Sequence, residues 1–128
     1  MSDFRPVLYM KISCPWCLKL AAFLAEAGIW DEFEVRGFYE GDENEAAIRA
    51  ELAEHYEKAS FPTLQYEPGK YMIESGDIID RYAAKLGLDP EKMSFYQYVL
   101  AGPLRANRER WTELMGLRKE LEEIKVGA

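Results

Sequence analysis

The two cysteines of this 128-residue chain stand together in the motif Cys14-Pro15-Trp16-Cys17. The motif follows a short apolar run and precedes a helical pattern from Leu18 to Ala27. A cysteine at the start of a helix lies beside unpaired N–H groups and the positive end of the helix dipole, which together stabilise a thiolate. A thiolate is the nucleophile of thiol–disulfide exchange, and Cys17, one turn further on, can attack a disulfide formed at Cys14. The pair therefore favours redox chemistry, with both cysteines as catalytic candidates.

The same motif also occurs in zinc sites and as a structural pair. A structural zinc ion takes four ligands, whereas the chain has no third cysteine and a single histidine, His55. A disulfide across so short a loop removes little entropy from the unfolded chain. We therefore expect no metal site and interpret the motif as redox-active.

Charge and composition argue against several other classes of protein. The chain has 23 acidic and 16 basic residues and a net charge of −7, whereas binding to nucleic acid or to an anionic membrane needs a basic face. No segment has the length of a transmembrane helix, and the residues before Val7 do not resemble a signal peptide. We therefore expect a cytoplasmic protein, in a reducing compartment where such a pair is more often catalytic than structural.

Apolar periodicity and turn residues predict the elements that position the cysteines. Strands are expected at residues 7–12, 33–38, 60–66 and 71–73, and helices at 17–27, 41–56 and 75–86. The alternation from Phe33 to Phe38 predicts a strand with one buried face. Ser75 is expected to cap the last of these helices, and Gly87 to end it.

This order predicts an α/β fold with a mixed four-stranded sheet and helices on both faces, in which the first unit is parallel and the last hairpin antiparallel. Two further helices are expected, from Glu91 to Leu100 and from Leu104 to about Lys125, with Gly102-Pro103 interrupting them. They are too short for an independent domain. We therefore divide the chain into a sheet domain, residues 1–88, and a helical extension, residues 89–128, that packs on it or on a partner.

Three separated motifs carry a resemblance to a known family. They are Cys14-Pro15-Trp16-Cys17, Phe61-Pro62-Thr63-Leu64 and Glu74-Ser75-Gly76-Asp77-Ile78. With them, the stretch from Phe4 to Gly87 resembles the glutaredoxins and the glutaredoxin-like N-terminal domain of glutathione transferases. The resemblance implies a thioredoxin-like fold of order β-α-β-α-β-β-α, a cis peptide bond before Pro62 facing the cysteines, and glutathione as co-substrate. The Glu-Ser pair is closer to the transferases than to the glutaredoxins.

The resemblance also implies contacts with the two ends of glutathione. The N–H groups of Ser75 and Gly76 would bind the γ-glutamyl carboxylate at a helix start. Glu74 or Asp77 would meet the γ-glutamyl amine, and Lys11 the glycine carboxylate.

Two further residues are implied at the middle of the tripeptide. The backbone of Phe61, turned outward by Pro62, would pair with the cysteinyl part as one strand pairs with another. Trp16 would form an exposed aromatic rim, although a core position is the alternative. The purely structural alternatives for the other two motifs are a trans proline at a strand edge, at Pro62, and a helix cap without a binding role, at Ser75.

The implied activity is reduction of protein or glutathione mixed disulfides through Cys14, with glutathionylated or disulfide-bonded proteins as partners. One alternative is an iron–sulfur carrier in which two chains share a cluster through Cys14, although Pro15 stiffens the loop and disfavours this. Another is a transferase-like binding module or homodimer that uses the apolar face of the C-terminal helices, around Trp111 and Leu114. About forty residues follow Gly87, so we do not expect the hydrophobic acceptor pocket of a conjugating transferase.

Overall fold

The computed structural model describes residues 4–127 of the chain. Four strands form one sheet: β1 (Val7–Lys11), β2 (Glu34–Phe38), β3 (Thr63–Glu67) and β4 (Lys70–Ile73). Their order across the sheet is β2-β1-β3-β4, with β1 parallel to β2 and the other two neighbouring pairs antiparallel. The mixed four-stranded sheet predicted above is therefore confirmed.

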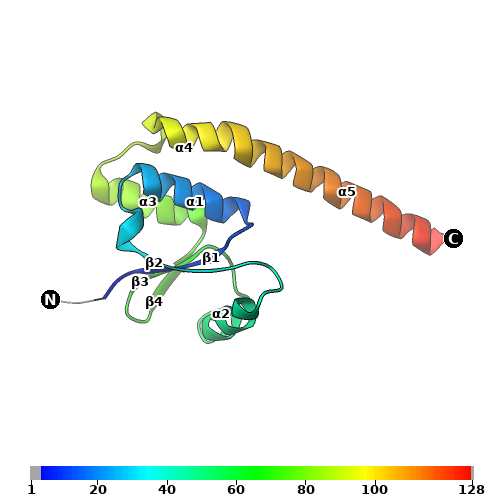
Figure 1. Cartoon of the computed structure of the whole chain (residues 1–128), viewed down its shortest axis with the longest axis horizontal. Coiled ribbons are helices and arrows are strands. Elements are labelled where there is room, and N and C mark those ends of the chain that lie inside the picture. The colour runs from blue at the N-terminus through cyan, green and yellow to red at the C-terminus, as the bar shows by residue number, and fades with distance from the viewer. Residues whose placement is uncertain (1–3, 128) are drawn as a thin grey trace.

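Helices cover both faces of this sheet (Figure 1). On one face lie α1 (Pro15–Glu26) and α3 (Ser75–Leu86), and on the other lies α2 (Glu43–Ala53). The element order β-α-β-α-β-β-α is the one expected of a thioredoxin-like fold. Because β1 is central, the site that follows it lies at the middle of one edge of the sheet domain.

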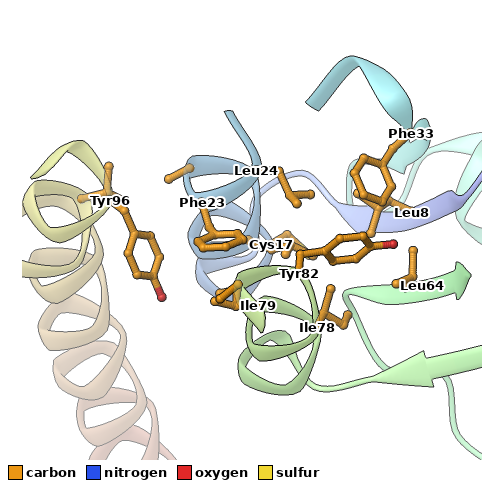
Figure 2. Close-up of a cluster of buried hydrophobic side chains, with 14 of the residues drawn as sticks. Leu8, Cys17, Phe23, Leu24, Phe33, Leu64, Ile78, Ile79, Tyr82 and Tyr96 are labelled. Atoms are coloured by element: carbon orange, nitrogen blue, oxygen red, sulfur yellow. The ribbon is translucent and has the colours of Figure 1, made fainter. Parts of the chain in front are cut away.

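The sheet separates two hydrophobic clusters, and β1 contributes to both because alternate side chains of a strand point to opposite faces. The larger cluster lies under α1 and α3 (Figure 2) and includes Leu8, Cys17, Phe23, Leu64, Ile78 and Tyr82. The smaller cluster lies under α2 and consists of Val7, Tyr9, Phe38, Ile48 and Leu52. Because β1 is buried on both faces, its sequence is a continuous apolar run instead of an alternating one.

The strand β2 lies at the sheet edge and does not have the single buried face that its alternation predicts. Val35 is 39% exposed, whereas Phe33 and Phe38 are buried. Five positions separate the two phenylalanines, so they point to opposite faces, and each joins a different cluster. The strand was correctly predicted, but its buried face was not.

The ends of α2 and α3 differ slightly from the predicted ones. Asp42 caps α2 by accepting the N–H groups of Asn44 and Glu45, and the helix ends at Ala53, before the predicted Tyr56. Glu74 occupies the cap position of α3, so Ser75 is the first helical residue and not the cap. Gly87, in the left-handed conformation at φ 66°, ends α3 as predicted.

The C-terminal extension is continuous where an interruption was predicted. After a 3-10 turn at Pro90–Lys92 come α4 (Ser94–Val99), a π-helical turn (Leu100–Leu104) and α5 (Arg105–Gly127). The π-helical turn contains both Gly102 and Pro103. The chain thus continues through a wider turn at the proline instead of breaking there, which corrects the prediction of two separated helices.

The short helix α4 is fixed to the sheet domain through α1. The Glu26 carboxylate accepts the backbone N–H of Phe95 at 3.3 Å and that of Tyr96 at 2.6 Å, which satisfies two donors that a helix start leaves open. The Tyr96 ring packs edge-on against Phe23, with 5.7 Å between the ring centroids (Figure 2). Leu104 follows α4 and is also buried in the larger cluster.

The long helix α5 extends away from the sheet domain (Figure 1). From Arg105 to Val126, only Ala106 and Met115 are even half-buried. Its large apolar side chains are therefore exposed: Trp111, Leu114, Leu117, Leu121 and Ile124. Across residues 4–127, α5 included, no helix combines the length and the apolar character needed to cross a membrane.

Candidate active site

Cys14 is held at the N-cap position of α1, directly beyond the end of β1. Its backbone is extended, at φ −83° and ψ 128°, and its N–H donates to the carbonyl of Lys11 at 2.9 Å. Pro15 occupies the first helical position, where a missing N–H costs nothing and a fixed φ suits the helix. The sequence therefore folds into a tight turn that presents the Cys14 sulfur at the start of a helix.

The surroundings of Cys14 favour its thiolate. The side-chain hydrogen bond from Cys17 lowers the pKa of Cys14 most, followed by the backbone N–H groups of Cys17 and Trp16 and by the charge of Lys11. Partial burial opposes them, yet the pKa of Cys14 falls to about 6. At neutral pH, Cys14 is therefore mostly ionised and reactive.

Cys17 has the opposite electrostatic environment. The hydrogen bond that it gives to Cys14, its burial and the nearby charge of Cys14 all raise the pKa of the Cys17 thiol. Its side chain is only 3% exposed and packs in the larger cluster. Both cysteines are free thiols here. The two sulfurs are thus unequal: Cys14 is partly exposed and has a lowered pKa, whereas Cys17 is buried and keeps its proton.

The loop before β3 brings a backbone carbonyl to the nucleophile. The Phe61–Pro62 peptide bond is cis, as expected, and the Phe61 carbonyl oxygen lies 4.0 Å from Cys14 Sγ. The fully buried Thr63 donates from its hydroxyl to the carbonyl of Ser60 at 2.5 Å. This hydrogen bond holds the loop in place on the side that faces Cys14.

The first turn of α3 lies across the same pocket. Glu74, before it, has φ 75° and ψ 111°, a backbone region that residues other than glycine rarely adopt. No side chain caps the helix, so the N–H groups of its first turn, at Ser75 and Gly76, have no intrahelical partner. They form the positive end of the helix dipole, which attracts a carboxylate.

These elements enclose a pocket with a volume of about 370 Å³. That volume is within the range of roughly 300 to 1,000 Å³ that is usual for small-molecule sites. The pocket is lined by residues of α1, of the cis-proline loop and of the α3 start: Trp16, Lys19, Ser60, Phe61, Pro62, Glu74, Ser75 and Gly76. Cys14 lies at its edge through the contact with Phe61.

Most of the residues predicted to bind glutathione meet in this pocket, but two do not line it. Asp77 lies one residue beyond the lining residues of α3. Lys11 is near enough to lower the pKa of Cys14, but its ammonium group lies 3.5 Å from the carboxylate of Glu40. The predicted role of Lys11 thus competes with an ion pair inside the chain.

Two lining residues were absent from the predicted binding set. Lys19 lies three residues after Trp16, and that spacing places both on one face of α1. Ser60 immediately precedes the cis-proline pair. Spacing within the helix could have identified Lys19. No sequence signal indicates that Arg108 of α5 lies over the Trp16 ring, 5.8 Å from its centroid.

A second pocket, also of about 370 Å³, lies at the opposite end of the sheet domain. It is formed near the start of β1 and the end of α3, and Arg5, Tyr66, Arg81 and Lys85 are among its residues. Arg81 already stacks on Tyr66, 4.3 Å from the ring centroid. With no cysteine in its lining, this pocket has no share in the thiol chemistry.

Fold and site together define a thioredoxin-like domain with a thiol pair at the start of its first helix. The chain belongs to the family described as the glutathione S-transferase N-terminal domain, whose model matches residues 8–88. The match covers the three motifs and all of the sheet except Val7. No curated protein matches the chain.

Among solved structures, the chain is similar to glutathione transferase Omega 3C from Trametes versicolor, with a TM-score of 0.52 and 20% identity over 67% of this chain. It is also similar to glutathione transferase Omega 2C from Trametes versicolor, with a TM-score of 0.47, 18% identity, and coverage of 70% of this chain and 44% of that one. The chain spans 35% of the length of the Omega 3C protein. The likeness to the Omega 3C protein concerns the fold alone.

Proposed function

We propose that this protein is a glutathione-dependent thiol–disulfide oxidoreductase that reduces mixed disulfides through Cys14. The observation that carries the proposal is the position of Cys14, whose pKa is lowered to about 6, beside the Phe61 carbonyl at the edge of the pocket. A low-pKa, accessible thiolate with a neighbouring thiol is what exchange chemistry requires. Membership of the glutathione S-transferase N-terminal family supports glutathione as the co-substrate.

Glutathione fits the pocket by the chemistry of its groups. The N–H groups of Ser75 and Gly76 bind the γ-glutamyl carboxylate, and Glu74 receives the γ-glutamyl amine. Lys19 lines the pocket and supplies a positive charge for the glycine carboxylate. Lys11 would first have to leave Glu40, so we favour Lys19 for this role.

The reaction starts with attack of the Cys14 thiolate on the glutathione sulfur of a protein–glutathione disulfide. That disulfide breaks, the protein thiolate leaves and takes a proton from water, and glutathione stays on Cys14. A second glutathione thiolate then attacks the glutathione sulfur, which releases oxidised glutathione and restores the Cys14 thiolate. In the net reaction, one protein–glutathione disulfide and one reduced glutathione become the protein thiol and oxidised glutathione. Cys17 is required only on the dithiol route. There it attacks the Cys14 sulfur, displaces the partner and forms an intramolecular disulfide with Cys14. We place this activity in a reducing cytoplasm.

The decisive experiment measures turnover of a glutathionylated peptide by the wild type, Cys14→Ser and Cys17→Ser. We expect Cys14→Ser to lose turnover to the background rate. Cys17→Ser should keep a substantial part of it, because the glutathione route bypasses Cys17. Full turnover by Cys14→Ser would show that the mechanism is wrong.

Glutathione binding is tested separately by calorimetry on Cys14→Ser, which removes exchange during the titration. Introducing Lys19→Gln into this variant should weaken glutathione binding by roughly tenfold or more, the worth of one charge-assisted hydrogen bond. The matched control is Lys85→Gln, a lysine of the pocket at the opposite end of the domain. Equal loss in both variants would contradict the placement of glutathione beside Trp16 and Lys19.

A further inference from the structure

The second half of α5 carries apolar residues at a heptad spacing. Leu114, Leu117, Leu121 and Ile124 are separated by three, four and three residues, the spacing of the a and d positions of a coiled coil. They are 41%, 56%, 53% and 68% exposed. We call these four residues the α5 seam.

The α5 seam faces away from the sheet domain. Arg108 reaches back over the ring of Trp16 in α1, which shows the side of α5 that is turned toward the domain. With Leu114 at an a position, Arg108 is at a b position, about 160° around the helix from the seam at roughly 100° per residue. Figure 1 shows α5 continuing beyond the domain, so the seam is open to a partner along its whole length.

The charged residues that flank the α5 seam favour a parallel over an antiparallel orientation of the partner helix. Glu113 and Glu120 occupy the g positions, whereas Arg118 and Lys125 occupy the e positions. In a parallel pair of helices, each g residue meets the e residue five positions later on the other chain, which joins Glu113 to Arg118 and Glu120 to Lys125. In an antiparallel pair, g meets g and e meets e, so like charges would meet.

These four charges are also not engaged elsewhere. In the part of the chain from residue 4 to residue 127, the ion pair within α5 joins Arg105 to Glu109, and none of the four takes part in one. The remaining g–e pair, Ala106 with Trp111, sets a small side chain opposite a large one. Every g–e contact of a parallel pair is therefore favourable or neutral.

We propose that the α5 seam docks against the same seam of a second copy of this chain, as a parallel two-stranded coiled coil. Upstream, Asn107 and Arg110 take the a and d positions, so the apolar contact begins at Leu114 and covers two heptads. Such a short contact gives a weak dimer that forms with rising concentration. The parallel arrangement places both sheet domains, and both Cys14 sites, at the same end of the pair.

Sedimentation equilibrium of the full chain, from micromolar to millimolar concentration, tests this proposal. The wild type should shift from monomer to dimer. Glu113→Lys with Glu120→Lys makes every charged g and e position basic and should weaken association by roughly tenfold or more. The matched control is Glu122→Lys with Glu123→Lys, which changes the net charge equally at the b and c positions and should dimerise at least as well as the wild type.

A fourfold variant separates the pairing from loss of folding. It combines Glu113→Lys and Glu120→Lys with Arg118→Glu and Lys125→Glu, so that each g–e pair is reversed and attractive again. We expect it to recover the wild-type dissociation constant, and circular dichroism should give the same helix content for all variants. A wild type that stays monomeric throughout, or a dimer unaffected by Glu113→Lys with Glu120→Lys, would overturn the proposal. An antiparallel pair predicts the second of these outcomes, because its like charges already repel.

Discussion

The buried thiol of Cys17 donates a hydrogen bond to the sulfur of Cys14 and moves the two pKa values in opposite directions. For each residue, this contact is the largest cause of the shift. Charge is therefore concentrated on the accessible sulfur, while the proton stays on the buried one. The asymmetry lies in the relation between the two residues and not in either cysteine alone.

Removing the Cys17 thiol, which donates the hydrogen bond, should return the pKa of Cys14 toward that of an ordinary thiol. In Cys17→Ala, we expect the pKa of Cys14 to rise from about 6 toward the usual thiol value of about 8.5. Cys17→Ser keeps a hydroxyl donor and should raise the pKa less. Thiolate absorbance in the ultraviolet, followed against pH, reports Cys14 alone in both variants. An unchanged midpoint in Cys17→Ala would show that the hydrogen bond does not control the pKa.

The lowered pKa of Cys14 also predicts how stability depends on pH. Between about pH 6 and pH 8.5, the folded protein has lost the Cys14 proton that the unfolded chain still binds, so stability rises with pH. This contribution is complete above the unfolded pKa and is lost as pH falls through the folded one. Cys17, with its raised pKa, acts only above this window, where it makes stability fall as pH rises.

Urea unfolding of the reduced protein measures this effect as the difference between wild type and Cys14→Ser. We expect that difference to grow by roughly 1–2 kcal/mol from pH 6 to pH 8.5, less than the full pKa shift implies because Cys14 is half exposed. Titrating groups other than the two cysteines contribute equally to both proteins and cancel, and the raised pKa of Cys17 keeps it protonated over this range in the wild type. Parallel stability curves over this range would contradict the prediction.

One carboxylate of α1, that of Glu26, accepts two backbone hydrogen bonds from α4 in addition to the packing of Tyr96 on Phe23. Replacement of Glu26 by Ala leaves the N–H groups of Phe95 and Tyr96 without their acceptor and should cost about 1–2 kcal/mol of unfolding free energy. Glu26→Gln keeps an acceptor oxygen and should cost less. Denaturant unfolding gives the free energies, and amide exchange at Tyr96 locates the loss. Glu122→Ala, on exposed α5, is the control and should stay within about 0.5 kcal/mol of wild type.

The hydroxyl of Thr63 should matter to the cis-proline loop although it lies outside the pocket. Thr63→Val keeps the shape but removes the donor to the Ser60 carbonyl, and we expect a loss of about 1–2 kcal/mol in stability. Thr63→Ser keeps the donor and serves as the matched control for glutathione affinity measured by calorimetry. If Val and Ser variants bind glutathione equally well, the hydroxyl does not organise the pocket.

Much of the fold could be predicted because local and long-range preferences agree. The apolar run of β1 is buried on both faces, and Gly87 adopts the left-handed conformation that ends α3. The thiol site was predictable for the same reason, since Pro15 and the helix start determine where Cys14 lies. Features that neighbouring residues determine can be predicted from the sequence.

The remaining features depend on packing between distant segments. The exposure of Val35 follows from the edge position of β2, and the unusual backbone of Glu74 follows from how β4 joins α3. The capping of α4 by Glu26 crosses about seventy residues of sequence. The ion pair of Lys11 with Glu40 likewise forms only once β1 and β2 are side by side. No pattern within a sequence window contains these relations.

The burial of Cys17 beside an accessible Cys14 also determines what peroxide does to this protein. Oxidation of the Cys14 thiolate gives a sulfenic acid, which further oxidant converts irreversibly to sulfinic and sulfonic acids. Here a protected thiol lies in hydrogen-bond contact with that sulfur. We expect it to condense with the sulfenic acid to a disulfide with release of water, a state that thiol exchange can reverse. We therefore expect the second cysteine to protect Cys14 against overoxidation, in addition to the role in exchange proposed above.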